Sequence, residues 1–301
     1  MSNRPQAAVA IIVALVCTAG AMYWLHIRDS RSQSALASPR LPDPVEAPKA
    51  DAPVTTSPES VPATSTNAPA AKITSQPTTA AGMPLRTGEV LEFTASVAKV
   101  SNVANLRLQV AERRDFLGKS AWHLQAFAHT QNPLRMVFEL DDQFDSYCDA
   151  ANLSSLQYEM HLSERGQKVE SIQRLTATGK EPAPANVTEA RVLPGTRDPL
   201  GMMQYLRHVD WTRTPSVHSP VYDGHNLYDV RATSGGGSES ITVPAGTYTA
   251  SKIAIRVFNN GQEVKDSSFN LYLANDAQRT PVLLEATLPF AVARVELAKA
   301  Q

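Results

Sequence analysis

The sequence is poor in cysteine and has no run of basic residues. Its 301 residues include only two cysteines, and Cys17 lies in an apolar run near the N-terminus, so Cys148 has no partner in the folded part. An intrachain disulfide, a CxxC redox motif and a cysteine-based zinc site are therefore excluded. The formal net charge is −1, so the electrostatic signature of nucleic-acid binding is missing as well.

Aromatic residues are absent from a long N-terminal stretch. None occurs in residues 25–92, whereas ten of the 21 prolines lie in residues 39–84, among Ala, Ser and Thr. Such a composition cannot bury enough apolar surface to offset the entropy of ordering the chain. Residues 29–85 are therefore predicted to be a disordered linker, and residues 86–301 the folded domain.

The N-terminal segment, residues 1–28, contains a run of 19 residues without a charge, 7–25. This length is about enough to cross a bilayer as a helix. It predicts a single-pass anchor in the bacterial inner membrane, with the folded domain in the periplasm and the membrane as a partner. The alternative is a signal peptide cleaved after Ala19-Gly20-Ala21, which would leave a periplasmic protein. Both interpretations export the domain.

Apolar and polar residues alternate through most of the folded domain, for example in 91–97, 122–126, 134–140 and 156–162. Strict period two indicates strands with one buried and one wetter face, typical of antiparallel sheets. About twelve strands are predicted.

Glycines mark several of the breaks between these strands. Asp223-Gly224 and Pro244-Ala245-Gly246 are expected to form tight turns. The run Gly235-Gly236-Gly237 is expected to form a loop.

One segment, RDPLGMMQYLR at 197–207, departs from the strand pattern. Asp198 is a good N-cap, and Pro199 suits the first helical position. The helix is predicted to present one apolar face, which carries Leu200, Met203 and Leu206, with Met202 beside it. At roughly ten residues it would be marginal alone, so it must pack on the sheet.

Arg197 and Arg207 bracket this predicted helix. An ion pair from either arginine to Asp223 or Asp276 is expected to hold the helix on the sheet. The alternative role for the arginines is to bind an anionic ligand headgroup.

Several short motifs follow one another along residues 86–298. They are Gly88-Glu89-x-Leu91-x-Phe93, Arg197-Asp198-Pro199-Leu200, Tyr205-Leu206-Arg207, Val221-x-Asp223-Gly224, Val243-Pro244-Ala245-Gly246-Thr247-Tyr248, Leu271-x-Leu273-x-x-Asp276 and Arg279-x-Pro281-Val282. In order and spacing they resemble the bacterial envelope family catalogued as domain of unknown function 3108, although Tyr272 stands where Trp is expected. The resemblance implies an exported or membrane-anchored domain, with structural roles for the motif residues and no catalytic residue. The fold it implies is mainly β: a curved antiparallel sheet, half-barrel or barrel-like, with one short helix packed on it.

Two constellations could carry chemistry. Asp141-Asp142-Gln143-Phe144-Asp145 spells DDxxD, and it is interpreted as a solvated turn at a strand end rather than as a metal site. His123 and His129 share one face of a predicted strand without a third ligand. No metal and no cofactor are predicted.

Three functions remain open. The first is a non-enzymatic envelope protein that binds a lipid, an acyl chain or another protein's apolar segment. Its adaptable lining would come from Leu200, Leu206 and four methionines: Met136, Met160, Met202 and Met203. The second is a scaffolding module tethered near an envelope partner protein. The third is a hydrolase of envelope glycan or lipid that depends on Asp142, Asp145 or His129.

Overall fold

The computed structural model of the chain describes residues 85–176, 184–264, 268–288 and 291–301. The predicted anchor, and the predicted linker up to residue 84, lie outside these ranges. Within them, no helix has the length and apolar character needed to span a bilayer.

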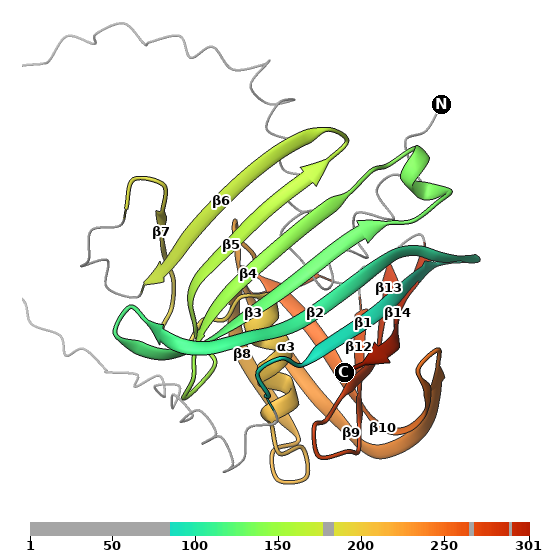
Figure 1. Cartoon of the computed structure of the whole chain (residues 1–301). Helices are drawn as coiled ribbons and strands as arrows, with labels where there is room; N and C mark the ends of the chain where they lie inside the picture. Colours follow the sequence, from blue (N-terminus) through green and yellow to red (C-terminus); the bar gives the residue numbers. More distant parts are fainter. Residues whose placement is uncertain (1–84, 177–183, 265–267, 289–290) are drawn as a thin grey trace, which may run out of the picture.

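The described part is mainly β and forms one continuous curved sheet (Figure 1). The strand order is β7-β6-β5-β4-β3-β2-β1-β14-β13-β12-β10-β9-β8, and β11 pairs only with β10. All strand pairs are antiparallel except β6 with β7. The strands are β1 (Val90–Val97), β2 (Val100–Phe116), β3 (Lys119–Thr130), β4 (Asp141–Asp149), β5 (Ser155–Glu164), β6 (Gln167–Thr176), β7 (Thr188–Arg191), β8 (Ser216–Tyr222), β9 (Leu227–Val243), β10 (Gly246–Asn259), β11 (Gln262–Glu263), β12 (Ser268–Ala274), β13 (Pro281–Leu288) and β14 (Ala291–Ala300).

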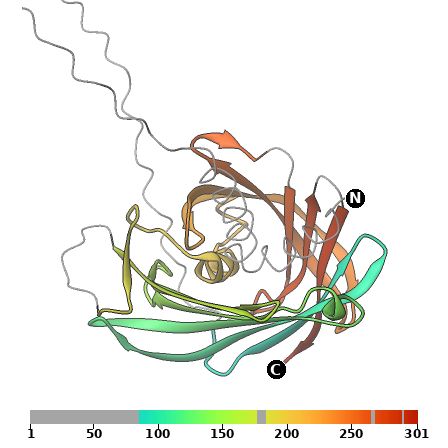
Figure 2. The same ribbon diagram turned by 90° about the horizontal axis from the view of Figure 1, so that it is seen from above.

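The topology consists of two meanders joined edge to edge. β1 to β6 follow one another in space as in sequence, and so do β8 to β14, apart from β11. The first and last strands of the domain, β1 and β14, pair with each other and connect the two meanders. Neighbouring strands all twist in the same sense, so a sheet of this width curls. It curls around residues 199–208, which lie between the two meanders in the sequence (Figure 2).

A short segment links the edge strand β8 to β5, near the other edge of the sheet, at one end of the molecule. Ser155 N in β5 donates to Thr196 O at 2.9 Å, and Arg197 N donates to Pro220 O in β8 at 3.0 Å. Tyr222 N donates back to Arg197 O at 2.8 Å. Residues 196–197 therefore bridge β5 and β8 and give the open sheet a barrel-like outline at that end.

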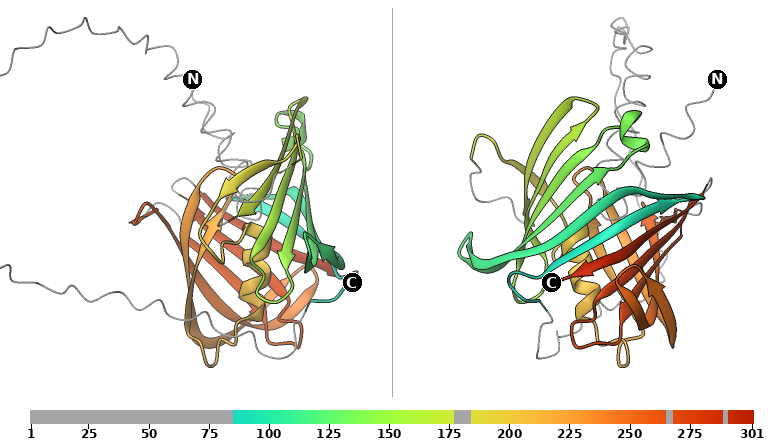
Figure 3. Two further views of the ribbon diagram at one scale, coloured as in Figure 1. Left: turned by 90° about the vertical axis from the view of Figure 1, so that its left-hand side faces the viewer. Right: turned by 45° about the vertical axis from the view of Figure 1, so that its right-hand side comes forward.

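The bridge leads directly into α3 (Pro199–His208), the only α-helix among the described residues. The predicted helix is confirmed, and Asp198 is its N-cap, accepting from Gly201 N at 2.8 Å. Its predicted packing on the sheet is confirmed, but its contacts are not confined to one apolar face. Only Pro199 and Met203 keep partial exposure, because α3 lies in the hollow of the curved sheet, where it contacts β3, β4 and β8 (Figure 3).

Two further predictions are corrected, while the turns at Asp223-Gly224 and Pro244–Gly246 are confirmed. The strand predicted at 134–140 is instead a 3-10 turn, η1 (Leu134–Met136), followed by a short connection to β4. The glycines predicted to form a loop, 235–237, lie inside β9, opposite the single residue Lys252 of β10. They form a bulge, in which Gly236 has a φ of +71°, and a bulge of this kind bends a long strand.

Candidate functional site

The N-terminal turn of α3 is held by buried polar groups of β4 and β5. Asp198 N donates to Ser155 Oγ at 2.7 Å, and the Asp198 carboxylate accepts from Ser146 Oγ. Asp198 is fully buried, and this burial raises the pKa of its carboxyl group despite these donors. Beside them, burial also raises the pKa of the Cys148 thiol, so Cys148 is an inert core residue.

Gly201 brings α3 unusually close to the sheet. A Cβ at this position would lie 2.9 Å from Cys148 Sγ, 3.1 Å from Ser155 Oγ and 3.2 Å from Leu153 O. Glycine weakens a helix by about 1 kcal/mol relative to alanine. The close approach of helix and strands explains why this weaker residue stands here.

Arg197 is fully buried, and no carboxylate within the described ranges pairs with it. Its guanidinium lies 3.6 Å from the centre of the Tyr205 ring and donates to Ser219 Oγ and Asn152 O, each at 2.8 Å. Burial lowers its pKa. The predicted pairing with Asp223 or Asp276 is therefore wrong for Arg197.

Arg207 forms an ion pair with Glu89, which was not among its predicted partners. Its Nη1 and Nη2 donate to Glu89 Oε2 and Oε1 at 2.9 and 2.8 Å, in a bidentate pair. The exposed fractions of the two side chains are 0% and 4%. Glu89 belongs to the Gly88-Glu89 motif, but 118 residues separate the partners, so no spacing in the sequence signals the pair.

The aspartates predicted as partners of the arginines stabilise turns instead. Asp223 Oδ1 accepts from the backbone of His225 and Asn226, which closes the turn that contains Gly224. Asp276 accepts from both the N–H and the hydroxyl of Thr280.

The turn that contains Asp276 also places Arg279 at the C-terminal end of α3. Arg279 Nη1 donates to Arg207 O at 3.1 Å and to Val209 O at 2.6 Å. A cation at this end of a helix satisfies free carbonyls and opposes the helix dipole. The motif residues thus converge on α3 from both meanders and hold it at both ends.

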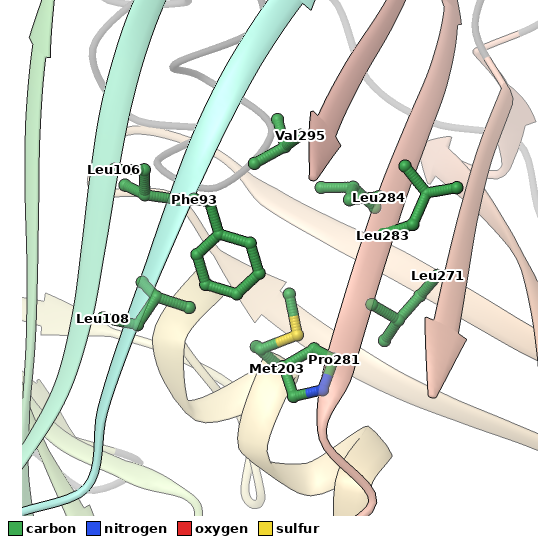
Figure 4. A pocket seen from close by; sticks show the side chains of 9 residues that line it. All are labelled: Phe93, Leu106, Leu108, Met203, Leu271, Pro281, Leu283, Leu284 and Val295. Atoms are coloured by element: carbon green, nitrogen blue, oxygen red, sulfur yellow. The ribbon is translucent and has the colours of Figure 1, made fainter. Parts of the chain in front are cut away.

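An apolar cavity lies between α3 and the sheet (Figure 4). Its free space is about 230 Å³ including the part open to solvent, but it has room for only about one water molecule. The lining offers such a water no polar partner. Nine side chains line it: Phe93, Leu106, Leu108, Met203, Leu271, Pro281, Leu283, Leu284 and Val295.

Of the six side chains predicted to line a ligand site, Met203 alone borders this cavity. Leu200, Met202, Leu206 and Met160 are buried parts of the core. The prediction for Met136 is wrong, because this residue is 82% exposed on η1.

The predicted hydrolase residues do not form one site. The DDxxD segment was predicted to be a solvated turn, but it forms the beginning of β4. On β4, Asp142 points to the same face of the sheet as Phe144 and Ser146, toward α3 and the core. Asp145 points to the opposite face, where its Oδ1 lies 2.6 Å from His123 Nε2. His129 also faces outward, on β3, so the three residues are divided between the two faces of the sheet.

Metal binding finds no support in these arrangements. No group of three or more His, Cys, Asp or Glu side chains in the described ranges could hold a metal ion. The described part of the chain is thus a barrel-like β domain with an inner helix and a small apolar cavity.

The family model described as Protein of unknown function (DUF3108) matches residues 92–298. The chain belongs to this family, as its motifs indicated. No protein in the curated collection matches this chain.

Three solved structures have a similar course of the chain. A β-barrel-like protein of domain of unknown function DUF1849 from Brucella abortus is 11% identical, with a TM-score of 0.46 over 71% of this chain and 97% of that chain. A candidate lipoprotein from Parabacteroides distasonis is 15% identical, with a TM-score of 0.35 over 73% and 97%. A candidate exported protein from Bacteroides fragilis is 10% identical, with a TM-score of 0.33 over 73% and 98%. Similarity at this level carries no information on ligand or reaction.

Proposed function

We propose that this protein is a non-enzymatic component of the bacterial cell envelope that holds an apolar ligand, such as an acyl chain of a lipid, between α3 and the sheet. Residues 7–25 would anchor it in the inner membrane with the domain in the periplasm. The observation that carries the proposal is the cavity itself, since every side chain that lines it is apolar. Such a space favours alkyl groups over water.

Met203 is the part of the lining that can make room. Ligand pockets usually measure 300–1,000 Å³, whereas this cavity has room for only about one water molecule. It therefore admits an alkyl chain only when a side chain moves. Met203 is unbranched and adaptable, and it is the only cavity residue on α3. The helix backbone is held at both ends by Asp198 and Arg279. Binding would therefore displace the Met203 side chain rather than the helix.

Cross-linking tests this proposal on the full chain in lipid nanodiscs. A twelve-carbon alcohol with a diazirine in its chain is photolysed with the protein, and the labelled peptides are mapped by mass spectrometry. Label is expected on the cavity residues of β1, β2 and α3. Met203→Ala should increase it several-fold by enlarging the cavity, whereas Met202→Ala, a matched truncation on the same helix away from the cavity, should leave it unchanged. Equal labelling in all three proteins would refute the proposal.

A scaffolding role is the second candidate. It is favoured by the same buried contacts at the ends of α3, which make the interior a rigid core. In that case neither truncation changes labelling, and in-membrane cross-linking of the wild type captures one reproducible partner protein.

A further inference from the structure

Exposed apolar side chains gather at one end of the domain. Of the described residues, six with large apolar side chains are exposed, and four of these lie at the end where β1 meets β2: Val100, Met136, Val137 and Val292. They are between 49% and 82% exposed, and they stand on three different connections or strand ends. These four side chains are called the apolar rim. Scattered single apolar residues are normal on a surface, whereas such a concentration marks an interaction site.

Backbone hydrogen bonds join the segments that carry the rim. Ala98 N, between β1 and β2, donates to Val292 O near the start of β14 at 2.9 Å. Gln131 N, just before η1, donates to Val103 O of β2 at 2.8 Å. The rim therefore follows one continuous edge of the domain, on the upper right of Figure 1.

Exposed cations flank the rim. Lys99 precedes Val100 in the sequence, and the β5–β6 turn, which carries Arg165 and Lys168, lies beside η1, because Arg165 N donates to Glu139 O at 2.9 Å. No ion pair within the described ranges involves any of these three cations. Their charge is therefore free to meet an anionic partner.

The carboxylates that follow η1 are already neutralised. Arg135 Nη2 lies 2.9 Å from Glu139 Oε1 and 2.7 Å from Asp141 Oδ2. These two acidic groups are held by one guanidinium group, so they do little to oppose an anion beside the rim.

The chain enters the domain at the opposite end. Gly88 N donates to Val110 O there at 2.8 Å, and β1 runs from this end to the rim. With a rise of about 3.3 Å per residue, β1 is roughly 25 Å long. The predicted linker, residues 29–85, spans on the order of 40 Å as a flexible coil. A linker of this length lets the rim turn toward the membrane of the predicted anchor, whereas a much shorter one would keep the entry end there.

We propose that the apolar rim docks the domain onto the surface of a bilayer that contains anionic phospholipids. The four rim side chains enter the headgroup region, and Lys99, Arg165 and Lys168 lie beside the lipid phosphates. This inference rests on the envelope location in the proposed function and adds the surface through which the domain meets lipid. Separate apolar tips between cations suit a fluid bilayer, which closes around each tip, better than a protein partner, whose interface needs a continuous packed core.

Site-specific cross-linking to lipid tests the inference. The photoreactive residue p-benzoylphenylalanine replaces Met136 in one protein and Leu117 in another, and each full chain is reconstituted in vesicles of phosphatidylcholine with or without phosphatidylglycerol. Leu117 is the matched control, because it is also apolar and exposed but lies in the β2–β3 turn at the other end of the domain. After illumination, lipid adducts measured by mass spectrometry are expected to be several-fold more abundant at position 136 than at position 117. Phosphatidylglycerol should raise the yield at position 136.

Further substitutions separate the apolar from the electrostatic part. Val100→Ser should reduce the lipid adducts at position 136 several-fold in both kinds of vesicle, whereas Leu193→Ser, which changes an exposed leucine outside the rim, should leave them unchanged. The double variant Lys99→Gln/Lys168→Gln should remove most of the increase caused by phosphatidylglycerol and little of the yield without it. All these side chains are exposed, so the variants should keep the melting temperature of the wild type.

The opposite results would overturn the inference. Equal lipid adducts at positions 136 and 117 would show that the rim does not face the bilayer. A cross-linked product of twice the mass of the chain, in place of lipid adducts, would assign the rim to a second copy of the protein. The diazirine alcohol reports on the cavity independently of the rim. Lipid adducts at position 136 without labelling of the cavity would therefore overturn only the proposed ligand, and labelling of the cavity without these adducts only the docking surface.

Discussion

Replacing Arg207 with methionine should strongly destabilise the protein, because Glu89 then remains in the interior as an uncompensated charge. The two side chains are 0% and 4% exposed and share two hydrogen bonds of 2.8 and 2.9 Å. Removing one partner of such a pair costs roughly 3–5 kcal/mol. Stability totals only about 5–15 kcal/mol in typical domains, so the variant should lose a large share of it.

The double variant Glu89→Leu/Arg207→Met separates the charge from the packing. Replacing a whole buried pair with apolar residues is often nearly neutral, so the double variant should recover most of the loss. Recovery should remain incomplete, since Gln204 Oε1 and Gln278 O also lose their donor.

Urea denaturation followed by tryptophan fluorescence measures these effects. Trp211 is a suitable reporter, because its Nε1 donates to Leu206 O next to Arg207. Arg114→Met is the matched control: its pair with Glu112 is 45% and 46% exposed, and its loss should cost less than about 1 kcal/mol. The reasoning would be refuted if Arg207→Met cost no more than this control, or if the double variant lost the sum of the two single losses.

Three further predictions concern α3 and the interior. Gly201→Ala should destabilise the protein by about 1–3 kcal/mol in urea titrations, despite its better helix propensity, and Cys148→Ala in the same chain should relieve part of the loss by removing Sγ. The pKa of Asp142 is raised to about 7 in the folded state. Protonated Asp142 therefore contributes to the free energy of unfolding below about pH 4, and this contribution is lost as the pH rises to 7. Asp142→Asn should abolish this part of the pH dependence of the urea midpoint, and an unaltered profile would contradict the assignment. Burial lowers the pKa of His208 to about 4. Stability should therefore fall as the pH drops from 6.5 to 4, because in this range the imidazole is protonated in the unfolded state and neutral in the folded state. His208→Asn should make the loss of stability over this range less steep, and an equally steep loss would show that another group causes it.

Local chemistry in the sequence determined the elements of this protein. The N-cap Asp198 with Pro199 specified the start of α3, because capping acts within one helical turn. Strict alternation specified most strands and the face that each one buries, and the glycines at 224 and 246 marked hairpin turns. The same alternation misled at 134–140 and the glycine run misled at 235–237, since period two also occurs by chance in a connection and a bulge tolerates glycines as well as a loop does.

Contacts between distant segments were decided only by the tertiary structure. The sequence could not show that Arg207 would meet Glu89, because 118 residues and several strands separate them. Nor could it tell that α3 is buried on nearly every side, since its apolar face predicts contact with one sheet and not enclosure by a sheet that curls around it. The sheet curls because the twist of many strands adds up, and it thereby encloses α3. Of the four methionines predicted to line a ligand site, only Met203 then borders the cavity. Asp142 and Asp145, three residues apart on β4, point to opposite faces by strand alternation alone, but only the tertiary structure places His123 beside Asp145.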